Sequence, residues 1–255
     1  MLNDLNNWYV FLLVGCRMTG VIFFNPIFGR SSIPALVKIG LALGIALNVS
    51  YGLTGISVAD YTTIDLLISI VKEFAVGFSM GFIMQLFLSV FHIGGELMDL
   101  QMGFSMAQMY DPSTNSQISV TGNLITIMYT LLFFITNSHL SLLAIAIKSF
   151  DAIPIGMGGI NSKLGIYMIE LFGYILVYAV QLALPIIVTE ILVEVAVGIM
   201  MKVVPNINVF VVNMQIKLMV GLIVIMTIIP VLVHFLGKIN AIMLDRMETV
   251  LMYFM

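Results

Sequence analysis

The chain has 255 residues, of which 61% are hydrophobic and only 9% are charged, and its formal net charge is −3. In soluble domains roughly a quarter of all residues are charged, so the composition excludes a soluble domain and indicates an integral membrane protein. The slight acidity argues against a nucleic-acid partner, and the single cysteine, Cys16, excludes a disulfide framework and a cysteine-based metal site.

Six apolar runs follow one another along the chain, and each predicts helical structure. Several reach the ~20 residues that a helix needs to cross a bilayer core, and none shows the alternation of a membrane β-barrel. Turn-rich segments with proline or glycine follow the first run and the fourth run. The runs cover residues 8–24, 39–56, 66–91, 124–147, 166–201 and 209–236. The sequence therefore predicts an all-α, polytopic helical membrane protein with long, partly broken helical hairpins.

The fifth run is too long for one simple span. A helix over residues 166–201 would be about 54 Å long at ~1.5 Å per residue, against a hydrocarbon core of ~30 Å. Pro185 lies inside this run and is expected to kink it. We therefore expect either two helical pieces or one helix that projects well beyond the lipid.

Charged side chains lie inside the apolar runs. At ~3 kcal/mol each near the bilayer centre, they would together cost on the order of 20 kcal/mol, so they are not expected to face lipid. They should meet partners or water, in this chain or in a neighbouring subunit. These residues are Arg17, Lys72, Glu73, Glu170, Glu190, Glu194 and Lys217. Just after the third run, Glu96 and Asp99 are further candidates for a buried or assembly charge.

Two functions are compatible with these charges. In a secondary transporter, Glu190 and Glu194 would share one helical face near Pro185 and form a proton or cation site. In an assembly, the same carboxylates would pair with Lys202, Lys217 or another chain. The sequence shows neither the inverted similarity nor the paired broken helices of transporters, and this favours the assembly.

One stretch of the sequence matches an enzyme motif but lacks the structural context that the motif requires. The sequence GFSMG at residues 77–81 matches the nucleophile elbow, but that motif requires a strand-to-helix turn with Asp and His partners. Inside an apolar helix, Gly77 and Gly81 would instead permit close helix packing. The histidines are scattered singly, without the spacing of a metalloprotease. We expect no catalytic residues, no metal and no cofactor, and therefore no enzyme.

Methionines at helical spacing mark the half-polar segment LMDLQMGFSMAQMYDP, residues 97–112. Steps of four, four and three place Met98, Met102, Met106 and Met109 on one face of a helix. They are either ordinary packing residues or a soft seal that adapts to changing partners. A gate for an extended polypeptide would need such a seal, because it must close against ions and yet deform around any cargo.

The stretch GGELMDLQMGFSMAQMYDP closely resembles the signature of the FliR family, flagellar biosynthetic membrane proteins of the type III export gate. RMTGVIFFNPIFGRSSIPALVKIGLAL is similar to the N-terminal portion of that family. NSHLSLLAIAIKSFDAIPIG and QLALPIIVTEILVEVAVGIMMKVVPNINVFVV are similar to its later blocks, so the resemblance covers the whole chain.

The resemblance implies a non-enzymatic gate subunit in the bacterial inner membrane, at the flagellar basal body. It implies a FliP-like part at residues 1–160, with a plug loop at about 94–120, and a FliQ-like helical hairpin and tail at 161–255. One copy would join FliP-like and FliQ-like subunits, with an FlhB-like switch protein, in a helical-pitched export-gate cone surrounded by lipid. Unfolded protein cargo would pass through that cone.

The resemblance also places the channel plug near residues 103–117. Its candidate gating residues are Gly103, Phe104, Ser105, Met106, Met109, Tyr110, Asp111 and Pro112. The nearest alternative is the homologous subunit of a virulence-type injectisome, which sequence pattern separates poorly from the flagellar one. A secondary transporter is the more distant alternative.

Overall fold

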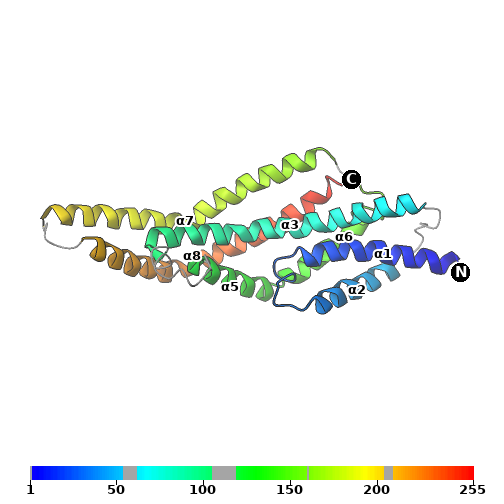
Figure 1. Ribbon diagram of the computed structural model, residues 1–255, viewed down its shortest axis with the longest axis horizontal. Helices are drawn as coiled ribbons and strands as arrows, with labels where there is room; N and C mark the ends of the chain where they lie inside the picture. Colours follow the sequence, from blue (N-terminus) through cyan, green and yellow to red (C-terminus); the bar gives the residue numbers. More distant parts are fainter. Residues whose placement is uncertain (1, 54–61, 105–118, 160, 204–208) are drawn as a thin grey trace. The chain divides into compact units, whose positions relative to one another are not determined.

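The computed structural model describes residues 2–53, 62–104, 119–159, 161–203 and 209–255, and every regular element in these ranges is a helix (Figure 1). This confirms the predicted all-α class. Helices suit such an apolar chain because they satisfy their own backbone hydrogen bonds without water. They are α1 (Leu2–Phe23), α2 (Ala35–Gly52), α3 (Thr63–Met102), α5 (Val120–Ile135), α6 (Ser138–Ala152), α7 (Lys163–Val203) and α8 (Val209–Leu251).

Four helices, α1, α3, α7 and α8, are longer than the apolar runs that predicted them, and α3 and α7 show it best. Helix α3 has 40 residues and continues through the polar positions after the third run as far as Met102. Helix α7 has 41 residues and is a single element with Pro185 inside it, so of the two alternatives for the fifth run the two-piece one is wrong. The hydroxyl of Thr189 donates to the carbonyl oxygen of Pro185 (2.7 Å) in this part of the helix.

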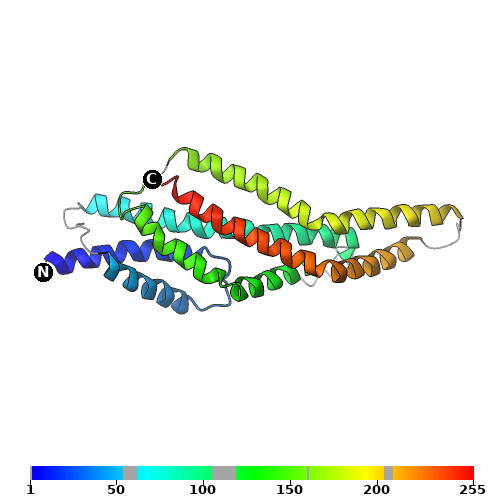
Figure 2. The ribbon, with the colours of Figure 1, turned by 180° about the vertical axis from the view of Figure 1, so that it is seen from behind.

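The fourth run, by contrast, forms two helices. Helix α5 ends at Ile135 and α6 begins at Ser138, and the break is visible in the green part of the ribbon (Figure 2). Asn137 lies between them with φ 56° and ψ 21°, the left-handed region. That conformation stops an α-helix, and asparagine is one of the few residues besides glycine that adopt it readily.

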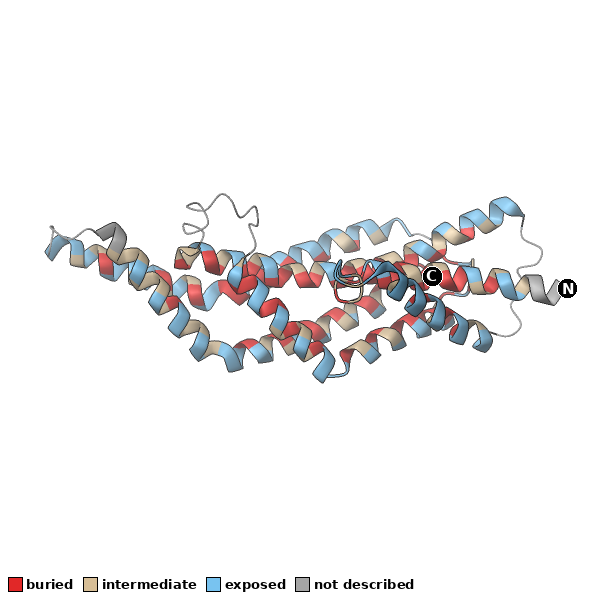
Figure 3. Ribbon diagram, turned by 60° about the horizontal axis from the view of Figure 1, so that its bottom comes forward, coloured by how far each residue is buried: buried red, intermediate tan, exposed pale blue. Residues whose placement is uncertain are grey.

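Among the described residues, four helices, α2, α3, α7 and α8, are long and apolar enough to cross a membrane, and the bent pair α5 and α6 could form a fifth span. Their burial differs widely: 61% of the most apolar stretch of α3 is buried, against 28% for α7 and 11% for α8. Pale-blue exposed residues accordingly cover long stretches of helix in Figure 3. The protein is thus polytopic, and α7 and α8 carry apolar surface that the chain itself leaves uncovered.

The chain divides into two compact units, which we call the first and the second unit. The first contains Met1–Phe87, Phe134–Glu170 and Asn240–Met255, and the second contains Leu88–Phe133 and Leu171–Ile239. In the first unit α1 packs against α2 (Figure 1). Fully buried side chains of its core include Leu13, Val14, Met18, Met80, Met84, Ala146 and Met243. Those of the second unit include Phe91, Met98, Met102, Tyr129, Phe133, Ala183 and Ile186.

Glycines bring the beginning of the chain close to the backbone of α3 in the first unit. A Cβ placed on Gly77 would overlap the carbonyl oxygen of Arg17. One placed on Gly81 would lie 2.9 Å from the Cβ of Phe24. Both contacts confirm the packing role predicted for these two glycines, because any larger residue would push the neighbouring segment away.

Candidate functional site

The described part of the methionine segment is the end of α3. Met98 and Met102 are both 0% exposed, so this half of the predicted stripe packs inside the second unit. Gly103 follows the helix with φ +84°, which a residue with a side chain rarely adopts, and Phe104 is half-buried. The other predicted gating residues lie outside the described residues: Ser105, Met106, Met109, Tyr110, Asp111 and Pro112.

Asp99, on the last turns of α3, is buried and fully engaged within the chain. Its carboxylate accepts hydrogen bonds from the hydroxyl of Ser119 (2.7 Å) and from the hydroxyl of Thr121 (2.5 Å). It also accepts the backbone N–H of Thr121, which is 3.3 Å from Oδ1. The hydroxyl oxygen of Ser119 in turn accepts the backbone N–H of Gly122 (2.8 Å), which makes Ser119 the N-cap of α5.

The same two helix ends are in backbone contact one turn away. A Cβ placed on Gly95 would overlap the backbone of Gly122. Helices can approach this closely only where both residues lack a side chain. Asp99 and the pair Gly95–Gly122 therefore hold the end of α3 directly against the start of α5.

The end of α3 also meets α7 and α8 within the second unit. A Cβ placed on Gly221 of α8 would overlap the side chain of Met102 and would lie 3.0 Å from Oε1 of Glu190. A Cβ on Gly103 would lie 3.9 Å from Cγ of Met214, an ordinary contact distance. Met102 of α3 and Glu190 of α7 therefore both lie against the α8 backbone at Gly221.

Glu190 is the unusual charge of this region. Its side chain is 0% exposed, and neither carboxylate oxygen has a hydrogen-bond partner among the described residues. One turn along α7, Glu194 pairs with Lys217 of α8 through an Nζ–Oε2 distance of 3.3 Å. That pair lies nearer the surface, with side chains 61% and 15% exposed respectively. Lys217 therefore pairs with the exposed carboxylate of Glu194 and not with the buried carboxylate of Glu190.

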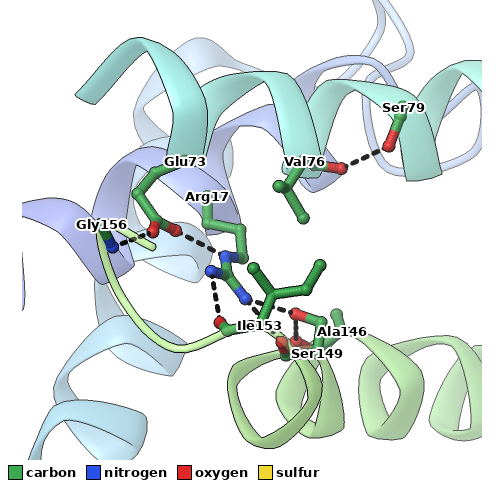
Figure 4. Close-up of polar contacts among 8 residues, drawn as sticks. All are labelled: Arg17, Glu73, Val76, Ser79, Ala146, Ser149, Ile153 and Gly156. Atoms are coloured by element: carbon green, nitrogen blue, oxygen red, sulfur yellow. Dashed lines mark hydrogen bonds and ion pairs between the residues drawn. The ribbon is translucent and has the colours of Figure 1, made fainter. Parts of the chain in front are cut away.

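A second charge cluster, around Arg17 of α1, lies in the first unit (Figure 4). Nε of Arg17 donates to Oε2 of Glu73 on α3 at 2.6 Å. Nη1 donates to the carbonyl oxygen of Ser149 (2.8 Å), and Nη2 donates to the carbonyl oxygen of Ile153 (2.9 Å). The other Glu73 oxygen accepts the backbone N–H of Gly156 (2.9 Å). The guanidinium thus ties α1, α3 and the end of α6 together.

Burial of this ion pair is complete, with side-chain exposures of 0% for Arg17 and 1% for Glu73. The guanidinium carbon also lies 4.1 Å from the centre of the Phe150 ring, a cation–π distance. A pair removed from solvent holds the fold only if its remaining donors and acceptors are bonded, and here both partners have further bonds. The geometry of the cluster is that of a structural tie, because both charged groups are buried and bonded within the chain.

The other predicted charges are less enclosed. Lys72 is half-buried, and Glu96 and Glu170 are exposed. Ser79, the centre of the GFSMG sequence, donates its hydroxyl to the carbonyl oxygen of Val76 (2.7 Å) inside α3. It lies on a helix and not on the strand-to-helix turn that a nucleophile requires. In the part of the chain that the structure describes, no three His, Cys, Asp or Glu side chains group as metal ligands.

Comparison with known proteins identifies the family of the chain. The family model described as "Bacterial export proteins, family 1" matches residues 8–242. The chain belongs to this family. Within it, the chain is similar to proteins named FliR, as the methionine segment and its flanking blocks predicted.

Three relatives align with 71% to 94% of this chain. The chain is 28% identical to the flagellar biosynthetic protein FliR of Bacillus subtilis (strain 168) over 254 residues, 94% of each chain. It is 28% identical to that of Escherichia coli (strain K12) over 219 residues, 86% of this chain and 84% of the relative. It is also 28% identical to the Yop proteins translocation protein T of Yersinia pestis over 184 residues, 71% of this chain and 70% of the relative.

Several residues that complete these sites carry little signal in the sequence. Ser119 and Thr121 precede an apolar run, so a helix N-cap could be predicted there, but not the carboxylate that binds them. The carbonyl groups of Ser149 and Ile153 that receive Arg17 carry no signal, because every residue has a carbonyl. The sequence indicated which charges would be buried, and the structure shows the partners of Arg17, Glu73 and Asp99.

Proposed function

We propose that this protein is a structural subunit of the flagellar type III protein export gate in the bacterial inner membrane, at the flagellar basal body. The observation that carries the proposal is the extent of the match. The family covers residues 8–242, and the Bacillus subtilis relative named FliR aligns over 94% of both chains. A match of this extent leaves no room for a different large domain in the aligned region.

We propose that its partners are FliP-like and FliQ-like gate subunits and an FlhB-like switch protein. In this proposal residues 1–160 form the FliP-like part, and residues 161–255 form the FliQ-like hairpin and tail. The low burial of the apolar parts of α7 and α8, 28% and 11%, supports further subunits or lipid around that hairpin. Large apolar surfaces of this kind are typical of interaction sites.

Weighing the complex tests the subunit proposal. The tagged chain is purified in a gentle detergent at native expression, and the intact complex is measured by mass spectrometry. One copy bound to several copies of two smaller membrane proteins is the expected result. A stable monomer or homodimer without other proteins would contradict the proposal and would favour a secondary transporter.

We propose that Glu194 and Lys217 contribute to the assembly surface of α7 and α8, with Glu190 enclosed behind them. The exposure of Glu194 supports this, since it can reach a neighbouring chain. Glu194→Gln and Lys217→Gln are expected to reduce recovery of the complex. Asp245→Asn is the control, because this carboxylate lies at the other end of α8 and was not predicted to be an assembly charge. Normal assembly of both variants with lost ion coupling would instead favour the transporter.

We propose further that Phe104, Met106, Met109 and Tyr110 help to seal the channel against ions. The burial of Met98 and Met102 supports this, because the residues directly before the segment are packed in the core at the end of α3. Deletion of residues 103–110 should raise ion conductance through the closed gate in a planar bilayer. The double variant Met106→Leu, Met109→Leu keeps apolar volume and should stay closed. An unchanged conductance after the deletion, in an assembled complex, would refute the seal.

A homologous subunit of a virulence-type injectisome is the second candidate. The similarity to the Yop proteins translocation protein T favours it, although it covers 71% of this chain where the Bacillus subtilis relative covers 94%. Complementation decides between them: the chain is expressed in strains that lack the flagellar or the injectisome subunit. Restored motility is expected, and restored injectisome secretion alone would favour the second candidate.

A further inference from the structure

The carboxyl group of Glu190 is enclosed inside the second unit without a bond to any residue that the structure describes. Its side chain is 0% exposed, and neither of its oxygens has a hydrogen-bond partner within the described ranges. An ionised carboxylate is a strong acceptor that needs several donors. Burying one without such donors is so costly that the group takes up a proton and becomes neutral.

The groups that meet Glu190 at the α8 backbone carry no charge. A Cβ placed on Gly221 of α8 would lie 3.0 Å from Oε1 of Glu190 and would also overlap the side chain of Met102 of α3. Glycine has no side chain that could donate a hydrogen bond, and the thioether of methionine is only a weak acceptor. On this side Glu190 therefore meets groups that suit a neutral side chain.

Among the described residues, two charged groups act on Glu190, one from its own helix and one from α8. Glu194 lies one turn further along α7, and like charges at that spacing repel each other. Lys217 of α8 is the cation, and its Nζ lies 3.3 Å from Oε2 of Glu194. If both carboxylates were ionised, one negative charge of this group would stay uncompensated. A proton on Glu190 makes the group neutral, which suits helices that are apolar enough to cross a membrane.

We propose that Glu190 is a proton-binding site: in the folded chain it holds a proton, taken from water, and packs against α8 as a neutral carboxylic acid. Glu194 stays ionised and paired with Lys217. Glu190 releases its proton when α7 separates from α8 at Gly221 and the carboxyl group reaches water. Packing of α7 against α8 is thereby linked to proton uptake. This inference concerns the chain itself, does not depend on the export-gate proposal, and involves no movement of protons across a membrane.

Infrared spectroscopy of the full chain, purified in a gentle detergent, tests the assignment. The carbonyl stretch of a neutral carboxylic acid lies above the amide I band, whereas a carboxylate absorbs below it. At about pH 7, where a glutamate in water is ionised, the spectrum of the unaltered chain minus that of Glu190→Gln should show an acid band. Glu248→Gln removes an exposed carboxylate of α8 and is the matched control. Its difference spectrum should show a carboxylate band and no acid band.

The pH dependence of unfolding tests the link to packing. A glutamate in water releases its proton above about pH 4.3, so the unfolded chain binds fewer protons than the folded chain at neutral pH. The unaltered chain should therefore lose stability relative to Glu190→Gln as the pH rises. The ratio of their unfolding equilibrium constants should rise about tenfold between about pH 5 and about pH 8. The ratio for Glu248→Gln should stay constant.

Two results would overturn the inference. A carboxylate band in place of the acid band, in the difference spectrum of Glu190→Gln, would show that Glu190 is ionised. A constant ratio of unfolding constants for Glu190→Gln would show that folding takes up no proton at this site. If Glu190→Gln does not fold, the unaltered chain decides: an acid band that disappears on unfolding at about pH 7 supports the site, and its absence from the folded chain refutes it.

Discussion

Lys217 donates to Glu194 at 3.3 Å, while Glu190, which lies one turn earlier on α7 and is buried, has no hydrogen-bond partner among the described residues. Of these two carboxylates on one face of α7, only the exposed one, Glu194, is paired with Lys217. The buried one, Glu190, is not. A carboxylate without hydrogen bonds in such a position lowers the stability of the isolated chain.

Neutralising the inner carboxylate should therefore be tolerated. We expect Glu190→Gln to leave the free energy of unfolding of the detergent-purified chain unchanged or to raise it by about 1 kcal/mol, because an amide is cheaper to bury. Glu194→Gln should lower it by less than about 1 kcal/mol, since that pair is near the surface. Thermal unfolding of both variants measures this. Strong destabilisation by Glu190→Gln would show that its oxygens are bonded after all.

The opposite result is expected for the buried ion pair of the first unit. Glu73→Gln leaves the guanidinium of Arg17 buried without its charge partner and should cost about 3–5 kcal/mol. Arg17→Met combined with Glu73→Leu should recover much of that loss, because no charge remains buried. Detergent unfolding curves of the single and double variants provide the measurement. Asp245→Asn, at an exposed pair with Arg246, is the control and should have little effect.

Backbone contact at Gly77 predicts a steric effect. Gly77→Ala should destabilise the chain by about 1–3 kcal/mol, because the new methyl group would meet the carbonyl oxygen of Arg17, which cannot move without α1. Gly44→Ala in α2, with no atom within 4 Å of the added Cβ, should be neutral or stabilising. Comparing the two melting temperatures tests this; equal behaviour would mean that α1 and α3 pack less tightly.

The described half of the methionine stripe should behave as core. Met98→Ala should cost about 2–5 kcal/mol through the cavity it leaves, and Met98→Leu less than about 1.5 kcal/mol. Met157→Ala, at a position 74% exposed, is the control. Stability is again read from thermal unfolding of the purified chain. If Met98→Ala is as stable as Met157→Ala, then Met98 is not a packing residue.

Periodicity predicted most of the fold but not all helix ends. By hydropathy alone the third apolar run ends near residue 91, because polar residues follow. Helix α3 continues to Met102 because Met98 and Met102 pack in the core, Glu96 is exposed, and the buried Asp99 is hydrogen-bonded to Ser119 and Thr121. The break between α5 and α6 depends on the backbone conformation of Asn137, and no proline or glycine marks it.

Long-range contacts explain why the sites were only half predictable. Composition alone showed that Arg17, Glu73 and Glu190 could not face lipid. It could not show that Arg17 bonds to residues 56 and 132 positions away, or that Glu190 has no hydrogen-bond partner within the described ranges. Those facts depend on how the helices meet, and a local pattern carries no record of that.

The cluster around Arg17 has a consequence for the order of synthesis. Helices α1, α3 and α6 leave the ribosome in that order, so Glu73 is available to Arg17 well before the carbonyl groups of Ser149 and Ile153 exist. Until then Nη1 and Nη2 of the guanidinium lack those two acceptors. A nascent chain that stops before α6 would carry an incompletely bonded charge into the bilayer. The first unit can therefore reach its final state in the membrane only after the ribosome has passed residue 153.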